Sequence, residues 1–298
     1  MNDLDTNDST AFCKPRLALM GEFSAGKSTL SNLLLEGTPL PTRVTATRLP
    51  PVWISYGAPG AVQVAHDGRE SEFSPDDIDD VDLDHTRLIR LQMEADFLQI
   101  CDLIDMPGIS DPNMDAEVWQ SVFGEVDSVV WCTHATQAWR QSEAATWDEI
   151  RDLTNGDNLL LVSQIDKLAS ERDRARVLAR IERETRGLFK GIYPVSLLDA
   201  LQAGEDGEKW NASGASDFID KLVEFLVNPA WLRPAEASGT PDGEPAAEVG
   251  EEIAAVIERD VIERDMADPE GHVTPKRVKA KSKAARPRPA AKPKRAFA

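Results

Sequence analysis

The segment Gly21–Thr29, GEFSAGKST, contains two glycines that enclose four residues and are followed by Lys, Ser and Thr. Glycines let successive backbone N–H groups turn toward an anion, and the apolar residues after Lys27 predict a helix whose N-terminal dipole favours negative charge. Lys27 has the charge that such loops direct at the β- and γ-phosphates, and the hydroxyl of Ser28 suits Mg²⁺. The loop therefore predicts a nucleoside triphosphate site, lined by Gly21, Glu22, Phe23, Ser24, Ala25, Gly26, Lys27, Ser28 and Thr29.

A second segment supplies what a nucleotide hydrolase needs beyond this loop. Residues 103–108 read LIDMPG, so a predicted strand ends at Asp105 and a Pro-Gly turn follows it. Asp105 is expected to hold Mg²⁺ through water. The N–H of Gly108 is expected to contact the γ-phosphate and to move when that phosphate leaves.

A threonine between these two segments is needed to complete the magnesium shell. The candidates lie in residues 40–51, LPTRVTATRLPP, and are Thr42, Thr45 and Thr47. Thr47 is favoured because of its place before the next predicted strand, and Thr45 is the second choice. Arg48 beside it has the charge of an arginine finger, although a surface position is the simpler interpretation.

The predicted elements alternate between strands and helices. We expect strands at 16–20, 52–56, 61–66, 98–105, 128–133, 159–163 and 192–195, and helices from about residue 27 to Gly37 and near 116–123, 142–153, 171–189 and 217–227. This alternation predicts an α/β fold of three layers, with a mostly parallel sheet covered by helices on both faces.

The distribution of charge separates the body of the chain from its end. The net charge is −19, yet ten Lys or Arg and no Asp or Glu lie from Lys276 onward. The acidic body argues against nucleic acid as a main ligand, and the basic end favours a separate anionic partner. No apolar run is long enough to span a bilayer, the polar N-terminus does not resemble a signal peptide, and the cysteines have no metal-binding spacing. A cytoplasmic location is expected.

Composition also predicts the division of the chain. The expected parts are a disordered N-terminus at 1–14, a nucleotide-binding domain at 15–228, a linker at 229–248, a short helix at 249–268 and a basic disordered tail at 269–298. The tail has too little apolar content to fold alone. It is a flexible extension that suits anionic lipid or nucleic acid, or the acidic body itself.

Taken together, GEFSAGKSTLSNLLL, LPTRVTATRLPP and LIDMPGISDP resemble the dynamin superfamily, particularly its bacterial members. The resemblance covers residues 14–228, including QAWRQSE at 137–143, and implies a Mg²⁺-dependent GTPase domain with the P-loop fold. It implies that Ser24 lies near the bridging β–γ oxygen. It also implies that Thr47 binds Mg²⁺ and orients water, and that Asp105 and Gly108 form the second switch.

The chain departs from the family pattern at several positions. Phe23 replaces a polar residue that helps to place the water in dynamin. The guanine motif, usually Asn/Thr-Lys-x-Asp, reads Ser163-Gln164-Ile165-Asp166. The resemblance implies that Asp166 accepts from guanine N1 and N2, that Gln164 lies over the base without charge, and that Ser196 is in the last base-contacting loop.

The resemblance also bears on partners. Only about 70 residues follow Asn228, too few for the helical stalk of dynamins. The implied partners are a second G domain, a stalk-bearing chain, and an anionic membrane surface contacted by the tail. Two other functions stay open: a nucleotide-switched module that recruits a partner with negligible hydrolysis, favoured by Phe23 and Gln164, and an ATPase.

Overall fold

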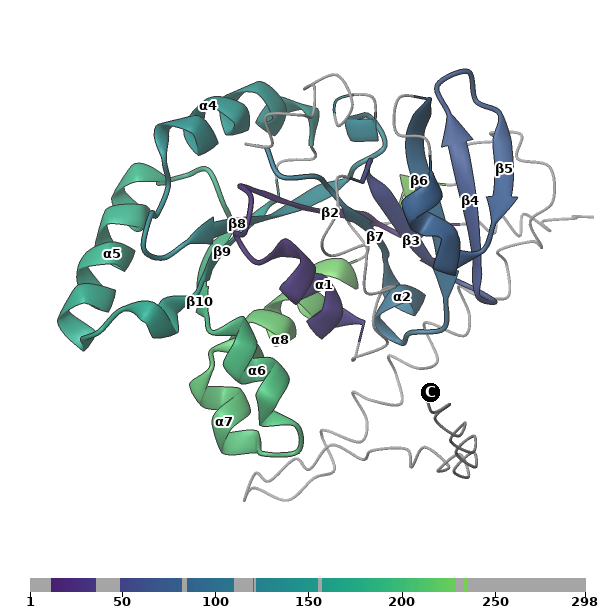
Figure 1. Cartoon of the computed structure of the whole chain (residues 1–298). Helices are drawn as coiled ribbons and strands as arrows, with labels where there is room; N and C mark the ends of the chain where they lie inside the picture. Colours follow the sequence, from purple (N-terminus) through teal and green to yellow (C-terminus); the bar gives the residue numbers. More distant parts are fainter. Residues whose placement is uncertain are drawn as a thin grey trace, which may run out of the picture. The chain divides into compact units, whose positions relative to one another are not determined.

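The computed structural model describes residues 12–35, 49–81, 85–109, 120, 122–154, 157–228 and 233–234 (Figure 1). The chain divides into two units between Met266 and Ala267, and every described residue belongs to the first unit. Among the described helices, none is both long and apolar enough to cross a membrane.

The described strands build one large sheet and a small ribbon. The large sheet has nine strands in the order β10-β9-β8-β2-β7-β3-β6-β4-β5. Pairing is parallel from β10 to β7 and between β3 and β6, and antiparallel elsewhere. The strands are β2 (Arg16–Gly21), β3 (Val52–Tyr56), β4 (Gly60–Ala65), β5 (Glu70–Phe73), β6 (Thr86–Met93), β7 (Asp102–Asp105), β8 (Ser128–His134), β9 (Leu159–Ser163) and β10 (Gly191–Val195).

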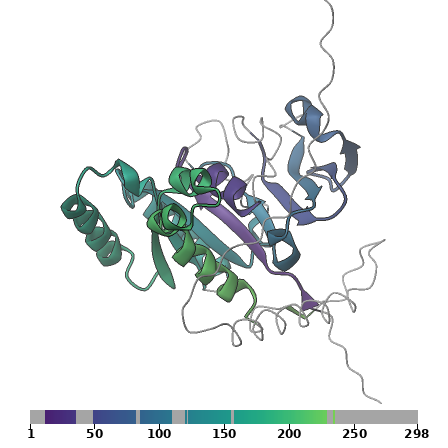
Figure 2. The same ribbon diagram turned by 90° about the horizontal axis from the view of Figure 1, so that it is seen from below.

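Helices cover both faces of this sheet (Figures 1 and 2). Alternate residues of the central strands enter two separate cores, so that Leu17 and Leu19 of β2 belong to one and Ala18 and Met20 to the other. The first core includes side chains of α1 (Lys27–Leu34), α2 (Phe97–Ile100), α6 (Leu197–Ala203) and α8 (Ala215–Leu226), with α7 (Gly207–Ala212) at its edge. The second core includes α4 (Gln141–Ile150) and α5 (Glu171–Glu184). The predicted three-layer α/β fold is confirmed.

Some local predictions need correction. Residues 98–105 were expected to form one strand, but residues 97–100 form α2 and β7 begins at Asp102. An apolar run of this length fits a helical turn as well as a strand, and burial of Phe97 and Leu98 in the first core selects the turn. The strands β5 and β6 and the helices α6 and α7 were not predicted. The expected helix at 116–123 lies mostly outside the described residues.

Short elements complete the described structure. Within the described ranges, three 3₁₀ turns occur, η1 (Pro75–Asp80), η2 (Arg151–Leu153) and η3 (Ile165–Lys167). The ribbon pairs β1 (Phe12–Cys13) antiparallel with β11 (Arg233–Pro234). The segment that precedes β2 and the segment that follows α8 therefore run side by side.

Candidate nucleotide-binding site

The parallel strands bring five connecting loops to one edge of the sheet. In the registers, Leu19 of β2 lies beside Asp105 of β7, and Gly21 lies beside Cys132 of β8. Further along the sheet, Ser163 of β9 lies between His134 of β8 and Val195 of β10. The segments after β2, β7, β8, β9 and β10 therefore leave the sheet close together, at the carboxyl edge where open α/β sheets bind ligands.

The loop between β2 and α1 follows a path that demands glycine. Gly21 has φ +141°, and a Cβ there would lie 2.1 Å from the carbonyl oxygen of Cys132. Gly26 has φ +100° at the start of α1, with Leu197 only 3.1 Å from the position of a Cβ. Ser24 adopts φ +59°, which is uncommon for a residue with a side chain. Uncommon backbone of this kind clusters at ligand-binding loops.

The ammonium group of Lys27 is enclosed by this loop. Its Nζ donates to the carbonyl oxygens of Gly21, at 3.0 Å, and Glu22, at 2.9 Å. Burial lowers the pKa of Lys27, and the nearby carboxylate of Asp105 opposes that shift. Because an ammonium has three N–H donors, one remains for a ligand.

The segment after β7 lies against the same loop. Asp105 is buried, and burial raises the pKa of its carboxyl to about 6 while Lys27 acts in the opposite direction. The N–H of Ile109 donates to the carbonyl oxygen of Gly21 at 3.3 Å. A Cβ on Gly108 would lie 3.1 Å from the backbone nitrogen of Phe23, so only a glycine fits this approach without displacement. The segment predicted to be the second switch therefore contacts the loop predicted to hold phosphate.

The residues at this edge suit a magnesium ion. A buried carboxylate (Asp105) at the end of β7 and a hydroxyl (Ser28) in the first turn of α1 are hard oxygen donors, the type Mg²⁺ prefers. A cation would also favour the ionised form of Asp105 against the cost of its burial. The remaining predicted ligand, Thr47, and its alternatives Thr42 and Thr45 lie outside the described residues, as does Arg48.

The predicted base-binding residues follow β9 and β10. Gln164 has φ +56°, and its Nε2 donates to the carbonyl oxygen of Ser24 at 3.1 Å, which joins the segment after β9 to the loop between β2 and α1. Asp166 is exposed, and its Oδ1 lies 3.0 Å from the hydroxyl of Ser196. That hydroxyl also lies 2.6 Å from Oδ2 of Asp199, and the N–H of Ser196 donates to the carbonyl oxygen of Ser213.

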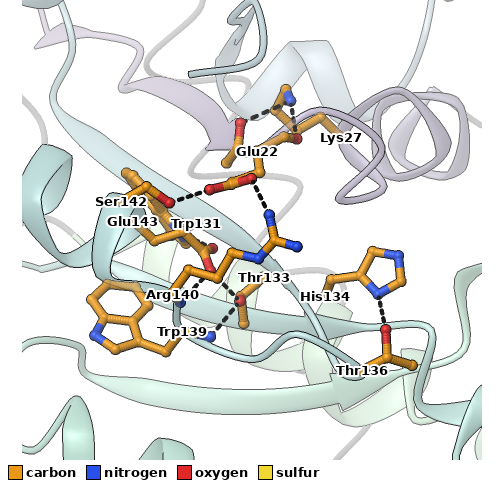
Figure 3. A network of polar contacts seen from close by, with 11 residues as sticks. Glu22, Lys27, Trp131, Thr133, His134, Thr136, Trp139, Arg140, Ser142 and Glu143 are labelled. Carbon is orange, nitrogen blue, oxygen red and sulfur yellow. Dashed lines mark hydrogen bonds and ion pairs between the residues drawn. The ribbon is translucent and has the colours of Figure 1, made fainter. Parts of the chain in front are cut away.

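A polar network on the loop between β8 and α4 was missed by sequence reasoning (Figure 3). The carboxylate of Glu22 pairs with Arg140 at 3.2 Å and accepts from the hydroxyl of Ser142. The buried Glu143 accepts from Trp131, Thr133 and the backbone N–H of Arg140. A local signal was present, since Arg-Gln-Ser-Glu at 140–143 resembles a helix start with Glu at its third position. Nothing local links it to Glu22.

His134 ends β8 close to this network. Its Nδ1 lies 3.0 Å from the hydroxyl of Thr136, and burial together with the charges of Lys167 and Arg140 lowers its pKa. This histidine contacts a neighbouring hydroxyl in its own turn, in line with a structural position.

Comparison with known proteins finds a relative of similar sequence and solved chains of similar fold. Dynamin-like protein 2 of Campylobacter jejuni subsp. jejuni strain 81-176 is 22% identical over 225 residues. Two solved chains, from structures described as an oligomerised bacterial dynamin pair, align over 84% of this chain with 16% identity and TM-scores of 0.51 and 0.50. The described part of the chain therefore shares the fold of the aligned region of these bacterial dynamin chains.

The region of similarity accounts for only part of the relatives' length. The aligned region is 73% of this chain but 36% of the Campylobacter protein, and 38% of each solved chain. No family model matches the sequence.

Proposed function

We propose that this chain binds guanine nucleotide with Mg²⁺ and hydrolyses GTP to GDP and phosphate. The observation that carries the proposal is the convergence of Lys27, Asp105 and Asp166 on loops that leave one edge of the sheet. The loop containing Lys27 suits phosphates, Asp105 suits a metal, and Asp166 suits a base, so a single nucleotide would satisfy all three.

On the phosphate side, catalysis would consist of positioning and charge stabilisation. The loop N–H groups, the free donor of Lys27 and the region of Ser24 would stabilise the negative charge that spreads over the transferring phosphoryl group. Mg²⁺, when bound to Ser28, Asp105 and Thr47, would neutralise phosphate charge. Gly108 and Thr47 are the proposed positioning groups for the attacking water.

On the base side, Asp166 would select guanine. Its carboxylate is exposed at the edge and can accept from the N1–H and N2–H groups of guanine, whereas adenine offers no such pair of donors. Ser196 would orient this carboxylate through their contact at 3.0 Å. Gln164 would lie beside the base and bring no charge.

The test is competition between GTP and ATP for the purified protein, followed by phosphate release. GTP should bind in preference, and Lys27→Ala should abolish binding or turnover because the phosphates lose their charged donor. Lys190→Ala, which removes the ion pair of the exposed Lys190 with the half-buried Asp157, is the matched control and should behave as wild type. Normal GTP hydrolysis by Lys27→Ala would overturn the assignment of this site, and equal competition by ATP would overturn the guanine assignment.

A second function, a nucleotide-switched module with negligible hydrolysis, is favoured by one observation. Phe23 is 73% exposed and its backbone lies against Gly108, where a polar side chain would assist the water. Turnover measured with and without anionic liposomes separates the two functions. Stimulation by lipid supports the dynamin-like GTPase, and absence of turnover under every condition supports the module.

The similar proteins also suggest partners for this chain, which we propose here. Because the solved bacterial pair is described as sensing and tethering membranes, we propose that the basic segment 269–298 brings this chain to the surface of an anionic membrane from the cytoplasm. We also propose pairing with a second G domain or with a stalk-bearing chain. Co-sedimentation with anionic and with neutral vesicles tests the membrane proposal. Equal sedimentation with both would contradict it.

A further inference from the structure

Glu22 connects two parts of the site through different atoms. Its backbone carbonyl accepts from Lys27, while its carboxylate points to the other side of the loop, toward Arg140 and Ser142 (Figure 3). The side chain of Glu22 is only 12% exposed and that of Arg140 is 45% exposed. The contacts of this carboxylate therefore restrain the same residue whose carbonyl oxygen accepts from Lys27.

Arg140 is itself held firmly at its backbone. Its N–H donates at 2.9 Å to Glu143, a carboxylate that is 2% exposed. The same carboxylate accepts from the indole N–H of Trp131 at 3.0 Å and from the hydroxyl of Thr133 at 3.1 Å. Both of these residues belong to β8, so Arg140 starts from a fixed point on the central sheet.

Trp139, the residue before Arg140, has a backbone conformation that its packing and hydrogen bonds impose. Trp139 has φ +53°, which is rare and strained for a bulky residue. Its N–H donates to the hydroxyl of Thr133 at 3.1 Å, and its ring packs edge-on against Trp131 and Phe189. Packing and hydrogen bonds together select one backbone conformation, which directs Arg140 at the phosphate loop.

We propose that Arg140 and Ser142 are positioning residues for the phosphate loop. They hold the carboxylate of Glu22, so that the carbonyl oxygens of Gly21 and Glu22 occupy two donors of Lys27 and direct the third at a phosphate. Neither residue touches the nucleotide in this role. The inference rests on the proposed nucleotide binding and extends it to the loop between β8 and α4.

The experiment is isothermal titration calorimetry, in which GDP with Mg²⁺ is titrated into variants of the 298-residue chain. The melting temperature of each variant is measured as well. Arg140→Gln removes a charged hydrogen bond and should weaken GDP binding about threefold to tenfold. Arg140→Lys keeps the charge and should remain within about twofold of wild type. Arg140→Glu should bind less tightly than Arg140→Gln, and adding Glu22→Lys to it should restore affinity by reversing the pair.

Arg90→Gln is the matched control. It breaks an ion pair of Arg90 with Glu70, 2.6 Å apart between β6 and β5, and should leave GDP affinity unchanged. If wild type binds GDP and Arg140→Gln and Arg140→Glu bind equally well, the positioning role is overturned while the proposed function stands. A loss that only follows a lower melting temperature, with no recovery in the reversed pair, also overturns it. Failure of wild type to bind GDP overturns both.

Discussion

The two halves of the proposed nucleotide site, its phosphate side and its base side, are built in different ways. On the phosphate side, Lys27 and Asp105 are buried, and Lys27 donates to two carbonyl oxygens of the loop. The Glu22–Arg140 ion pair, with Glu143 behind it, holds the other side of this loop. On the base side, Asp166 is exposed and Gln164 provides a single neutral hydrogen bond to the phosphate loop.

This difference predicts a rigid phosphate side and a base side that selects the ligand. Buried charges and close backbone contacts are costly to rearrange, so the phosphate side is expected to be preorganised. The exposed Asp166 and the single neutral hydrogen bond of Gln164 rearrange at a lower cost in free energy, so the base side is expected to adjust to its ligand. Substitutions on the phosphate side should therefore change folding stability as well as binding, and those on the base side should change binding alone.

The largest effect is expected for Gly21→Ala. The added Cβ would lie 2.1 Å from the carbonyl oxygen of Cys132 at φ +141°, so strain and overpacking together should lower the free energy of unfolding by about 4 kcal/mol. Gly68→Ala, at φ +83° with open space around it, isolates the backbone cost of about 1 kcal/mol. Urea denaturation compares the two variants. Similar losses would show that the phosphate loop is no more constrained than a surface turn.

Next is Glu143→Gln, which tests the support behind the phosphate loop. One amide oxygen replaces two carboxylate oxygens that face three donors, so the free energy of unfolding should fall by about 2–3 kcal/mol. Urea denaturation of both proteins measures this loss. A difference below about 0.5 kcal/mol would contradict the support role.

The same pair of proteins gives a pH dependence. Burial raises the pKa of Glu143 above its ordinary value of 4.5, so the folded state retains this proton to higher pH than the unfolded state. The stability contributed by this group is complete below about pH 4.5 and is lost as pH rises through the folded pKa. The advantage of wild type over Glu143→Gln should therefore shrink as pH rises above about 4.5. An advantage that grows with pH would contradict the sign of the shift.

Asp166→Asn tests the base side. The variant replaces a charged acceptor of two N–H groups, so the preference for GTP over ATP should fall about tenfold to a hundredfold. The melting temperature should stay unchanged because the side chain is exposed. Competition binding measures the ratio, and a ratio equal to that of wild type would remove Asp166 from the base site.

The smallest effect is expected for Gln164→Leu. Loss of the donor to the carbonyl oxygen of Ser24 should weaken GDP binding about threefold to tenfold without changing the melting temperature. Gln164→Lys retains a donor and adds charge, so it should bind at least as tightly as wild type. A GDP affinity of the Leu variant equal to that of wild type would show that the two halves of the site are independent.

Local patterns predicted the fold and the strand ends of the site. Short apolar runs ending in a polar residue, such as those before Asp105 and Asp166, placed both carboxylates at one edge because parallel strands end together. The strand β6 was missed because its sequence, TRLIRLQM, mixes charges among apolar residues and follows an acidic segment. Its burial depends on the flanking strands β3 and β4 rather than on its own pattern.

The links between the loops were beyond prediction from sequence. Glu22 and Arg140 are separated by 118 positions, and Gln164 and Ser24 by 140. Such pairs depend on where folded loops lie, and many partners of suitable charge exist in a chain with 29% charged residues. The positive φ of Trp139 is likewise imposed by packing against Trp131 and Phe189.

The ribbon of β1 and β11 has a mechanical consequence. Two residue pairs, Phe12 with Pro234 and Cys13 with Arg233, join the strand that leads into the domain to the strand that leaves it. A force that pulls these two strands apart would act on the short β1–β11 ribbon before it acts on the large sheet. A force that displaces β1 would therefore also act on β11, and the reverse.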